Sequence, residues 1–463
     1  MDGPIYPSTQ IRRIEQAAAD SVPPLMERAG AAAAALAATL VPDNRKDVLV
    51  LAGPGNNGGD ARIVAKLLKE RFFRVTLASS PEEIAAERDW GLVVDGLFGI
   101  GLARDIEGPH ALLVDIANRQ RCPVLALDIP SGIHADTGRV LGRAIRATHT
   151  ITFIGLKPGL LTLDGPDHAG EIVVETLGVP LPPASAWVCS PSLFREALKR
   201  RPRNFHKGQA GSLAVLGGAA GMTGAALLAG RAALKLGAGR VYVGLLDQHE
   251  TFDFTTPELM IRHVDDALGL DLDALVVGPG LGDSERAETV LGAALASDIP
   301  CVLDADGLNL LSQNPSFREA CAHRTAQTIV TPHPAEAARL LGSNVAAVQD
   351  DRVKAARMIS ENLNAHVVLK GNGSIVAARD GHWFVNATGN PGMASAGMGD
   401  VLAGLLGALL AQRYTGELAA VLGTHLHGAA ADALVREGTG PVGVTASEVV
   451  DASRRLWNAW LAI

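Results

Sequence analysis

Short apolar runs that alternate with helical segments are the feature that most restricts the fold of this 463-residue chain. Residues 48–51 form such a run, and it is followed by a glycine loop and by Ile63, Val64 and Leu67 at helical spacing. A strand that is buried on both faces of a parallel sheet has this composition, because neither face meets water. Strands that alternate with helices predict a doubly wound parallel α/β sheet.

The alternation is interrupted once, between residues 178 and 204, where a proline cluster and a run of basic residues are typical of a connector. Apolar runs lie on both sides of this segment, at residues 75–77, 92–94, 124–127 and 150–153 before it and at residues 213–216, 241–243, 275–277, 301–303, 328–330 and 367–369 after it. We therefore expect two α/β domains, residues 1–203 and 204–463, and the first of them is Rossmann-like.

Composition and charge exclude several classes of protein. Hydrophobic residues make up 48% of the chain, which is enough to form sizeable cores. Aromatic residues make up only 4% and the net charge is −8, so we expect no nucleic-acid partner. No signal peptide is visible, and the uncharged stretch 208–230 contains seven glycines, which favours a strand, a loop and a helix start over a membrane span. We expect a cytoplasmic protein without a membrane partner.

A glycine loop at residues 53–60 follows the first predicted strand and precedes a helix. Its glycines satisfy the GxGxxG pattern, whose backbone N–H groups bind pyrophosphate at a helix N-terminus. The acidic residue that a hydride-transfer site needs about 20 residues later is absent, so that kind of site is disfavoured. A tight turn explains the glycines, but it does not explain the polar residues Asn56, Asn57 and Asp60.

Further polar side chains follow two other predicted strands. Asp95 comes directly after residues 92–94, and Asp128 and Ser131 come after residues 124–127. Each aspartate alone could cap a helix, but ligands of open α/β sheets bind at the carboxyl ends of the strands. Oxygen ligands of this kind suit a hard cation or a polar ligand.

The runs PGNNGGD (54–60), DGLFGIG (95–101), LDIPSG (127–132) and TFIGLKPG (152–159) resemble the YjeF N-terminal family, the NAD(P)HX epimerases, over roughly residues 5 to 180. The resemblance implies that the substrate contacts Asn56, Asn57, Gly58, Gly59, Asp60, Gly99, Ile100, Gly101, Leu102, Ala103, Arg104, Asp105 and Asp128. It also implies that Asn57, Asp95 and Ser131 hold a potassium ion. Ala61 and Ile100 depart from the family pattern, which has Gly and Thr there, and neither removes a proposed ion ligand.

The epimerase substrate implied by the resemblance is a reduced nicotinamide that carries a hydroxyl group at ring carbon 6. Inversion of that carbon requires proton transfers and stabilisation of a transient cation, and a positioned carboxylate can supply both. Asp128 is the candidate acid/base.

In the second domain, residues 390–400 (NPGMASAGMGD) lead into the apolar run 401–411. Glycine N–H groups at the start of that helix would form an anion hole, although Asp400 could also simply stabilise the helix N-terminus. The loop is not a Walker A motif. Lys370 and its glycine loop follow another predicted strand, and His333, which could be structural, follows a third.

The runs HKG (206–208), GGAAGMTGAA (217–226) and DADGLN (304–309) resemble the YjeF C-terminal family, the ribokinase-like ADP-dependent NAD(P)HX dehydratases, over about residues 204 to 460. The resemblance implies that the hydrated dinucleotide contacts Ala225, Gly282, His333 and Asp400. It implies that the nucleotide contacts Lys370, Gly371, Asn372, Gly373, Ser374 and Gly399. Ala335 and Gly307 depart from the common residues Gly and Ala.

The implied mechanism resembles that of a kinase. Asp400 takes the proton from the ring hydroxyl, and the amides of residues 397–399, together with Mg²⁺, stabilise the phosphoryl group transferred from ADP. Two alternatives stay open, a small-molecule kinase of the thiazole or pyrimidine type and a non-catalytic nucleotide-binding protein. We favour a bifunctional repair enzyme that acts on NADHX and NADPHX, uses ADP and forms a homo-oligomer.

Overall fold

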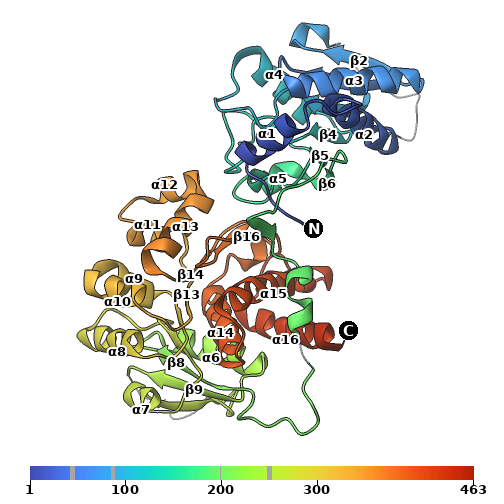
Figure 1. The fold of residues 1–463 in the computed structure, drawn as a ribbon. Helices are drawn as coiled ribbons and strands as arrows, with labels where there is room; N and C mark the ends of the chain where they lie inside the picture. The colour runs from blue at the N-terminus through green and yellow to red at the C-terminus, as the bar shows by residue number, and fades with distance from the viewer. Residues whose placement is uncertain (42–46, 85–88, 199, 248–252, 463) are drawn as a thin grey trace. The chain divides into compact units, whose positions relative to one another are not determined.

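The computed structural model describes residues 1–41, 47–84, 89–198, 200–247 and 253–462 and divides into two compact units (Figure 1). The N-terminal unit is Gly3–Trp187, and the C-terminal unit is Val188–Ile463 together with Met1–Asp2. The composition break places the domain boundary later, at 203/204. The units divide earlier because β7 (Ala186–Val188) joins the second sheet, and Cys189 N–H donates to the carbonyl of Val385 at 2.9 Å.

The N-terminal unit contains a six-stranded sheet in the order β2-β1-β3-β4-β5-β6, and every strand pair in it is parallel. The strands are β1 (Asp47–Ala52), β2 (Arg74–Ala78), β3 (Trp90–Gly96), β4 (Val124–Leu127), β5 (His149–Phe153) and β6 (Glu171–Glu175). The apolar runs predicted β1 to β5. They did not predict β6, because this edge strand is only half-buried and has a glutamate at each end.

Helices cover both faces of this sheet, which confirms the doubly wound prediction. They are α1 (Ser8–Ala17), α2 (Leu25–Leu40), α3 (Asn56–Glu70), α4 (Gly108–Asn118) and α5 (Gly165–Ala169), with the short 3-10 turns η1 (Pro81–Glu83) and η2 (Pro158–Leu160). Successive strand residues point to opposite faces. Val48 and Val50 therefore pack in one core with α2 and α3, whereas Leu49 and Leu51 pack in a second core with α4.

The C-terminal unit contains a ten-stranded sheet in the order β10-β9-β8-β11-β12-β13-β14-β15-β16-β7. Its strands besides β7 are β8 (Ser212–Gly217), β9 (Arg240–Leu245), β10 (Met260–His263), β11 (Ala274–Val277), β12 (Cys301–Leu303), β13 (Thr328–Val330), β14 (His366–Leu369), β15 (Ser374–Ala377) and β16 (Trp383–Asn386). The strands from β10 to β14 are parallel, and β15 and β16 extend the sheet as antiparallel strands.

The helices of this unit are α6 (Thr223–Lys235), α7 (Val264–Leu268), α8 (Glu285–Ala296), α9 (Asp306–Gln313), α10 (Pro315–Ala322), α11 (Pro334–Leu340), α12 (Val345–Asp350), α13 (Arg352–Leu363), α14 (Met398–Ala411), α15 (Gly416–Arg436) and α16 (Ala446–Ala462), with η3 (Pro191–Leu193), η4 (Arg195–Ala197) and η5 (Pro391–Met393). Among the described residues, α15 alone is long and apolar enough to cross a membrane, but 78% of its apolar window is buried inside the structure. It is therefore a core helix of this unit.

Each sheet reverses its winding direction once. In the N-terminal unit the chain goes from β1 outward to β2 and returns on the other side of β1 to form β3. In the C-terminal unit β8 and β11 are the corresponding neighbours. Loops that leave two such strands diverge and open a crevice at their carboxyl ends, which is where open α/β sheets bind ligands.

Candidate active sites

The glycine loop after β1 places α3 directly against the crevice between β1 and β3. A Cβ atom on Gly58 would lie 1.9 Å from the carbonyl oxygen of Gly53, and a Cβ atom on Gly53 would lie 1.8 Å from that of Leu97. Only glycine permits such close backbone approach. The loop therefore starts α3 at Asn56 and buries Asn57 and Asp60 in its first turns, whereas Asn56 stays exposed.

Asp95 and Ser131 meet at the ends of β3 and β4, as the strand pattern predicts. Asp95 is fully buried, and it accepts hydrogen bonds from the Ser131 hydroxyl at 2.6 Å and the Ser131 amide at 2.8 Å. Burial raises the pKa of Asp95 to about 6, and the bonds from Ser131 and the Leu97 amide oppose that rise. Asn57 is also buried, and neither atom of its amide group has a hydrogen-bond partner in the structure.

Asp128 lies at the same crevice, directly after β4. It adopts a left-handed backbone conformation with φ of 67°, which is uncommon for a residue other than glycine and turns the chain sharply after the strand. A Cβ atom on Gly99 would lie 3.0 Å from Asp128 Oδ2 and 3.5 Å from Asn57 Cγ. The structure therefore brings Asn57, Gly99 and Asp128 together, and Asp128 Oδ2 also accepts a 3.3 Å bond from the Ile100 amide.

Lys157 is a residue of this site that the sequence analysis did not single out. Its fully buried ammonium group donates to Asp128 Oδ1 at 2.5 Å, to Thr152 Oγ1 at 2.8 Å and to the Phe153 carbonyl at 2.7 Å. The three bonds use all three donors of the ammonium group. Lys157 is the only charged residue of the segment 150–163, and this is the signal that could have found it, because a buried lysine is almost always paired.

The charge of Asp128 acts on two more carboxyl groups. Burial, and then the charges of Asp128 and Glu15, raise the pKa of Asp60 to about 8. Glu15 is exposed on α1, yet the surrounding protein displaces enough water to raise its pKa, and Asp128 adds to that rise. Helix α1, which sequence reasoning did not place at the site, therefore contributes an acidic residue to it.

The remaining residues of the first predicted site are placed less closely. Gly59 packs beside Met26 of α2, because a Cβ atom there would lie 2.7 Å from the Met26 sulfur. Gly101 faces Arg12, whose guanidinium would lie 3.9 Å from a Cβ atom on that glycine. Leu102 is buried in the core beside α4, whereas Ala103, Arg104 and Asp105 are exposed.

In the C-terminal unit Lys370 is the centre of a charged cluster at the strand ends. Its ammonium group lies 2.8 Å from Asp304 Oδ1 and 3.8 Å from Glu336 Oε2. Buried Asp304, which sequence reasoning did not select, also accepts a 2.8 Å bond from the Thr331 hydroxyl. A Cβ atom on Gly399 would lie 3.3 Å from Lys370 Nζ, so the start of α14 lies against this cluster.

Asp400 lies in the first turn of α14, after Gly397, whose φ of 86° sets the bend. Burial raises the pKa of Asp400 to about 6, with further contributions from Asp304 and Asp306, while Lys370 lowers it. The carboxylate is therefore ionised at neutral pH and has a basicity suited to proton transfer near neutral pH.

His333 caps helix α11 and has a clear structural role. Its Nδ1 accepts from the amides of Ala335 and Glu336, and the Glu336 side chain accepts from the His333 amide at 2.7 Å. Burial and the charge of Lys370 lower the pKa of His333. Burial raises the pKa of Glu336 to about 7. The histidine is half-exposed beside the Lys370 cluster, so capping and ligand contact are compatible.

The other predicted positions of this unit are Gly282, Ala225 and residues 371–374. Gly282 donates a 2.9 Å hydrogen bond to Asp306, which links it to the surroundings of Asp400. Ala225 is half-buried in the first turn of α6. The loop of residues 371–374 closes on itself, because the Gly371 amide donates to the Ser374 hydroxyl at 3.3 Å and that hydroxyl donates to the Gly371 carbonyl at 3.0 Å.

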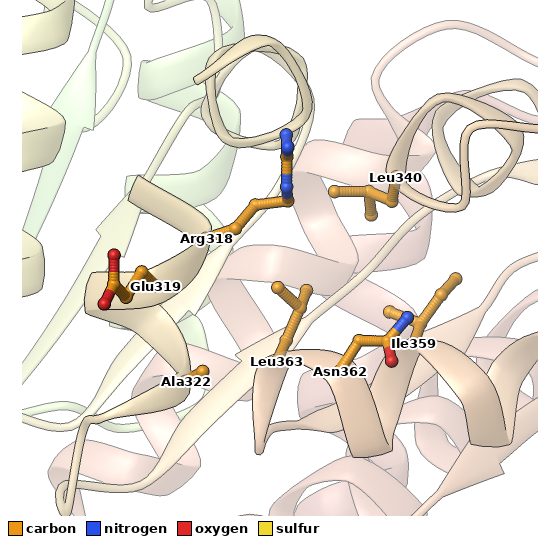
Figure 2. Close-up of a pocket in the computed structure, with 7 residues that line it drawn as sticks. All are labelled: Arg318, Glu319, Ala322, Leu340, Ile359, Asn362 and Leu363. Carbon is orange, nitrogen blue, oxygen red and sulfur yellow. The ribbon is translucent and has the colours of Figure 1, made fainter. Parts of the chain in front are cut away.

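A surface hollow lies among α10, α11 and α13 of the C-terminal unit (Figure 2). It is lined by Arg318, Glu319, Ala322, Leu340, Ile359, Asn362 and Leu363. None of the predicted site residues lines it.

Comparisons with known proteins match both units. A family model described as NAD(P)H-hydrate dehydratase matches residues 213–455, and one described as YjeF-related protein N-terminus matches residues 23–91 and 77–159. The chain is 37% identical to a bifunctional NAD(P)H-hydrate repair enzyme of Coxiella burnetii, over 98% of this chain and 99% of that protein.

Two solved structures resemble the C-terminal unit. An ADP/ATP-dependent NAD(P)H-hydrate dehydratase of Bacillus subtilis, crystallised with ATP and Mg²⁺, aligns with a TM-score of 0.52 at 28% identity, over 59% of this chain and 98% of that one. A ribokinase-like superfamily protein of Enterococcus faecalis aligns with a TM-score of 0.53 at 25% identity, over 61% of this chain and 98% of that one. The predicted ribokinase-like fold is confirmed.

Proposed function

The chain belongs to the bifunctional NAD(P)H-hydrate repair enzymes, and from that premise we propose how its residues divide the two reactions. It is an epimerase of hydrated NAD(P)H and a dehydratase that restores NAD(P)H. The crevice of the N-terminal unit carries the epimerisation, and the Asp400 cluster of the C-terminal unit carries the dehydration. The observation that supports this division is that each unit brings its own set of acid/base carboxylates to the strand ends.

In the epimerase site Asp128 gives a proton to the hydroxyl group of carbon 6, which leaves as water, and the resulting carboxylate takes a proton from the water that adds to the opposite face of the ring. The carboxylate is aimed by Lys157 on one oxygen and by the Ile100 amide on the other. Its negative charge stabilises the cation that forms when the hydroxyl leaves. The residues of the glycine loop and of the segment 99–105 bind the remainder of the dinucleotide.

Replacing Lys157 by methionine is expected to reduce both stability and epimerisation. The substitution leaves Asp128 without its buried counter-charge, and breaking a buried ion pair costs about 3–5 kcal/mol. We expect the lower end of that range, because the Asp128 side chain is 14% exposed at the crevice. Denaturant unfolding and an epimer-exchange assay measure the two effects. Lys66→Met, which removes a lysine from an exposed 3.9 Å pair on α3, is the matched control and should change neither; equal values for the two variants would contradict the assignment.

Asn57, Asp95 and Ser131 fit a potassium ion. The buried Asn57 amide oxygen lacks a partner, and oxygens of Asp95 and Ser131 lie in the same crevice. When bound, the ion supplies fixed positive charge that orients oxygen atoms of the substrate. A bound ion would therefore give the Asn57 amide oxygen the partner that the protein itself does not provide.

Removal of potassium is expected to lower the epimerisation rate about 10–100-fold, as loss of a positioning group does at metal sites. The measurement compares the epimerisation rate in a K⁺ buffer with the rate in a buffer whose organic cation is too large to enter the proposed ion site. Asn57→Ala should be slow in both media. A wild-type rate that is the same in both would remove the ion from the account.

In the dehydratase site Asp400 takes the proton of the ring hydroxyl as that oxygen attacks the terminal phosphate of ADP. Lys370, the loop 371–374 and Gly399 bind the nucleotide. The carboxylates of Asp304 and Asp306 form an acidic neighbourhood that fits Mg²⁺, which when bound neutralises phosphate charge. AMP is the leaving group of this transfer. The phosphorylated oxygen then leaves carbon 6 as phosphate, and loss of a proton from the adjacent ring carbon restores the double bond.

The alternative of a small-molecule kinase would leave a stable phosphorylated product, and family membership disfavours it. We further propose that the protein acts in the cytoplasm as a homo-oligomer on both NADHX and NADPHX, and that ADP rather than ATP is its phosphoryl donor. The fused arrangement of the two domains supports the last point.

A further inference from the structure

Arg352, the first residue of α13, is a buried cation beneath the loop of Lys370. It is only 1% exposed and is the largest fully buried side chain among the described residues. Its guanidinium donates to the Gln349 side chain at 2.8 Å and to the carbonyls of Leu369 and Lys370, both at 3.3 Å. The arginine therefore holds the backbone at the end of β14, directly before the loop 371–374.

The same guanidinium lies against Gly371. A Cβ atom on this glycine would come within 2.7 Å of both terminal nitrogens of Arg352, and the residue has φ of 147°. A larger residue would therefore displace the arginine or the loop. The guanidinium therefore packs directly against the backbone of the loop at Gly371.

Arg352 also places a positive charge beneath the loop 371–374. Burial lowers its pKa to about 10, so the side chain is still protonated at neutral pH. A positive charge in surroundings of low polarity acts over several ångströms, because little water screens it. A phosphate group on the loop would feel this charge in addition to that of Lys370.

We propose that Arg352 is a positioning residue for the nucleotide, which fixes the Lys370 backbone and the loop 371–374 in the conformation that binds phosphate. This inference rests on the proposed function of that loop. Arg352 does not touch the nucleotide, and it acts through the two carbonyls and through Gly371.

The test compares Arg352→Met with Arg324→Met. Arg324 is a second buried arginine of the same unit, and it donates to the carbonyls of Ala294, Leu295, Ser297 and Ile299. Those carbonyls precede β12, whereas Lys370 follows β14, and the strands from β12 to β14 are parallel. The two arginines therefore lie at opposite ends of the strands. Both variants lose a buried cation, but only one loses it beneath the loop.

We expect Arg352→Met to raise the KM for ADP about 10–100-fold, the range seen when a supporting residue of a ligand site is removed. The KM for the hydrated dinucleotide and the rate of epimerisation should stay within about twofold. Arg352→Lys keeps the charge but cannot bond both carbonyls in the same way. Its KM for ADP should therefore be intermediate, and this variant serves if the methionine variant does not fold.

An equal rise in the KM for ADP in the Arg324 and Arg352 variants would overturn the proposal, as would no rise in the Arg352 variants. Lys370→Met distinguishes failure of the proposed nucleotide site from failure of the proposed role of Arg352. If that variant binds ADP normally, the loop is not the nucleotide site, and the proposed function fails first. If it binds ADP poorly while both Arg352 variants bind ADP normally, only the role of Arg352 is wrong.

Discussion

Asp400→Ala is expected to lower the rate of dehydration by about 10²–10⁴ while epimerisation continues at the wild-type rate. Asp400 is the acidic residue in the first turn of α14, and its carboxylate is the proposed acceptor of the hydroxyl proton. The N-terminal unit has its own acid/base group, so it should be unaffected. The measurement is the return of reduced-nicotinamide absorbance from the hydrated S epimer, and separately the exchange between epimers.

The pH profile of dehydration tests the same residue. Asp400 must be ionised to accept a proton, and its pKa is raised to about 6, chiefly by burial. The value of kcat/KM should therefore be level above that pKa and fall about tenfold for each pH unit below it. Asp380→Asn, which changes an exposed aspartate of the same unit, should keep both the rate and the profile. Dehydration that survives in Asp400→Ala would refute the role.

Asp128→Asn is expected to lower the rate of epimerisation by about 10²–10⁴ and to leave dehydration of the S epimer unchanged. Asparagine keeps the size of the side chain, and its single amide oxygen can accept the bond of Lys157 or that of the Ile100 amide, but not both. It cannot take a proton or stabilise a cation. The loss would therefore report the chemistry of the carboxylate and not its packing.

The substitution also leaves the Lys157 ammonium without its counter-charge, so thermal unfolding of Asp128→Asn must be measured beside its activity. Asp167→Asn, at an exposed position of α5, is the control for loss of an aspartate from the same unit. A folded Asp128→Asn protein that exchanges the epimers at the wild-type rate would show that another residue is the acid/base.

Much of the fold could be predicted from the sequence, because strands buried on both faces must be continuously apolar. The strands that were missed have a different environment. Residues 171–175 and 260–263 form edge strands with exposed positions. Residues 374–377 and 383–386 form antiparallel strands between the loop of Lys370 and the segment 390–400, where no apolar run was singled out.

The prediction that polar side chains converge at the strand ends was sound for Asp95 and Ser131, which form a direct hydrogen bond. Asp304 directly follows the predicted strand 301–303 and fits the same pattern, although it was not selected. Lys157 and Glu15 could not be selected in that way, because neither directly follows a predicted strand. Lys157 and Asp304 are halves of ion pairs whose partners, Asp128 and Lys370, lie 29 and 66 residues away in the chain. Local pattern identifies a strand end, but it does not identify the residue that another segment brings to it.

Recovery of an epimeric mixture of hydrated NADH tests most directly whether one chain performs both repair reactions. The mixture is incubated with the protein, Mg²⁺, K⁺ and either ADP or ATP, and the absorbance of reduced nicotinamide is followed. The account predicts recovery of the whole mixture faster than spontaneous epimerisation, with ADP as the effective donor. Rapid recovery of only one epimer would contradict the epimerase assignment, and no recovery with either nucleotide would contradict both.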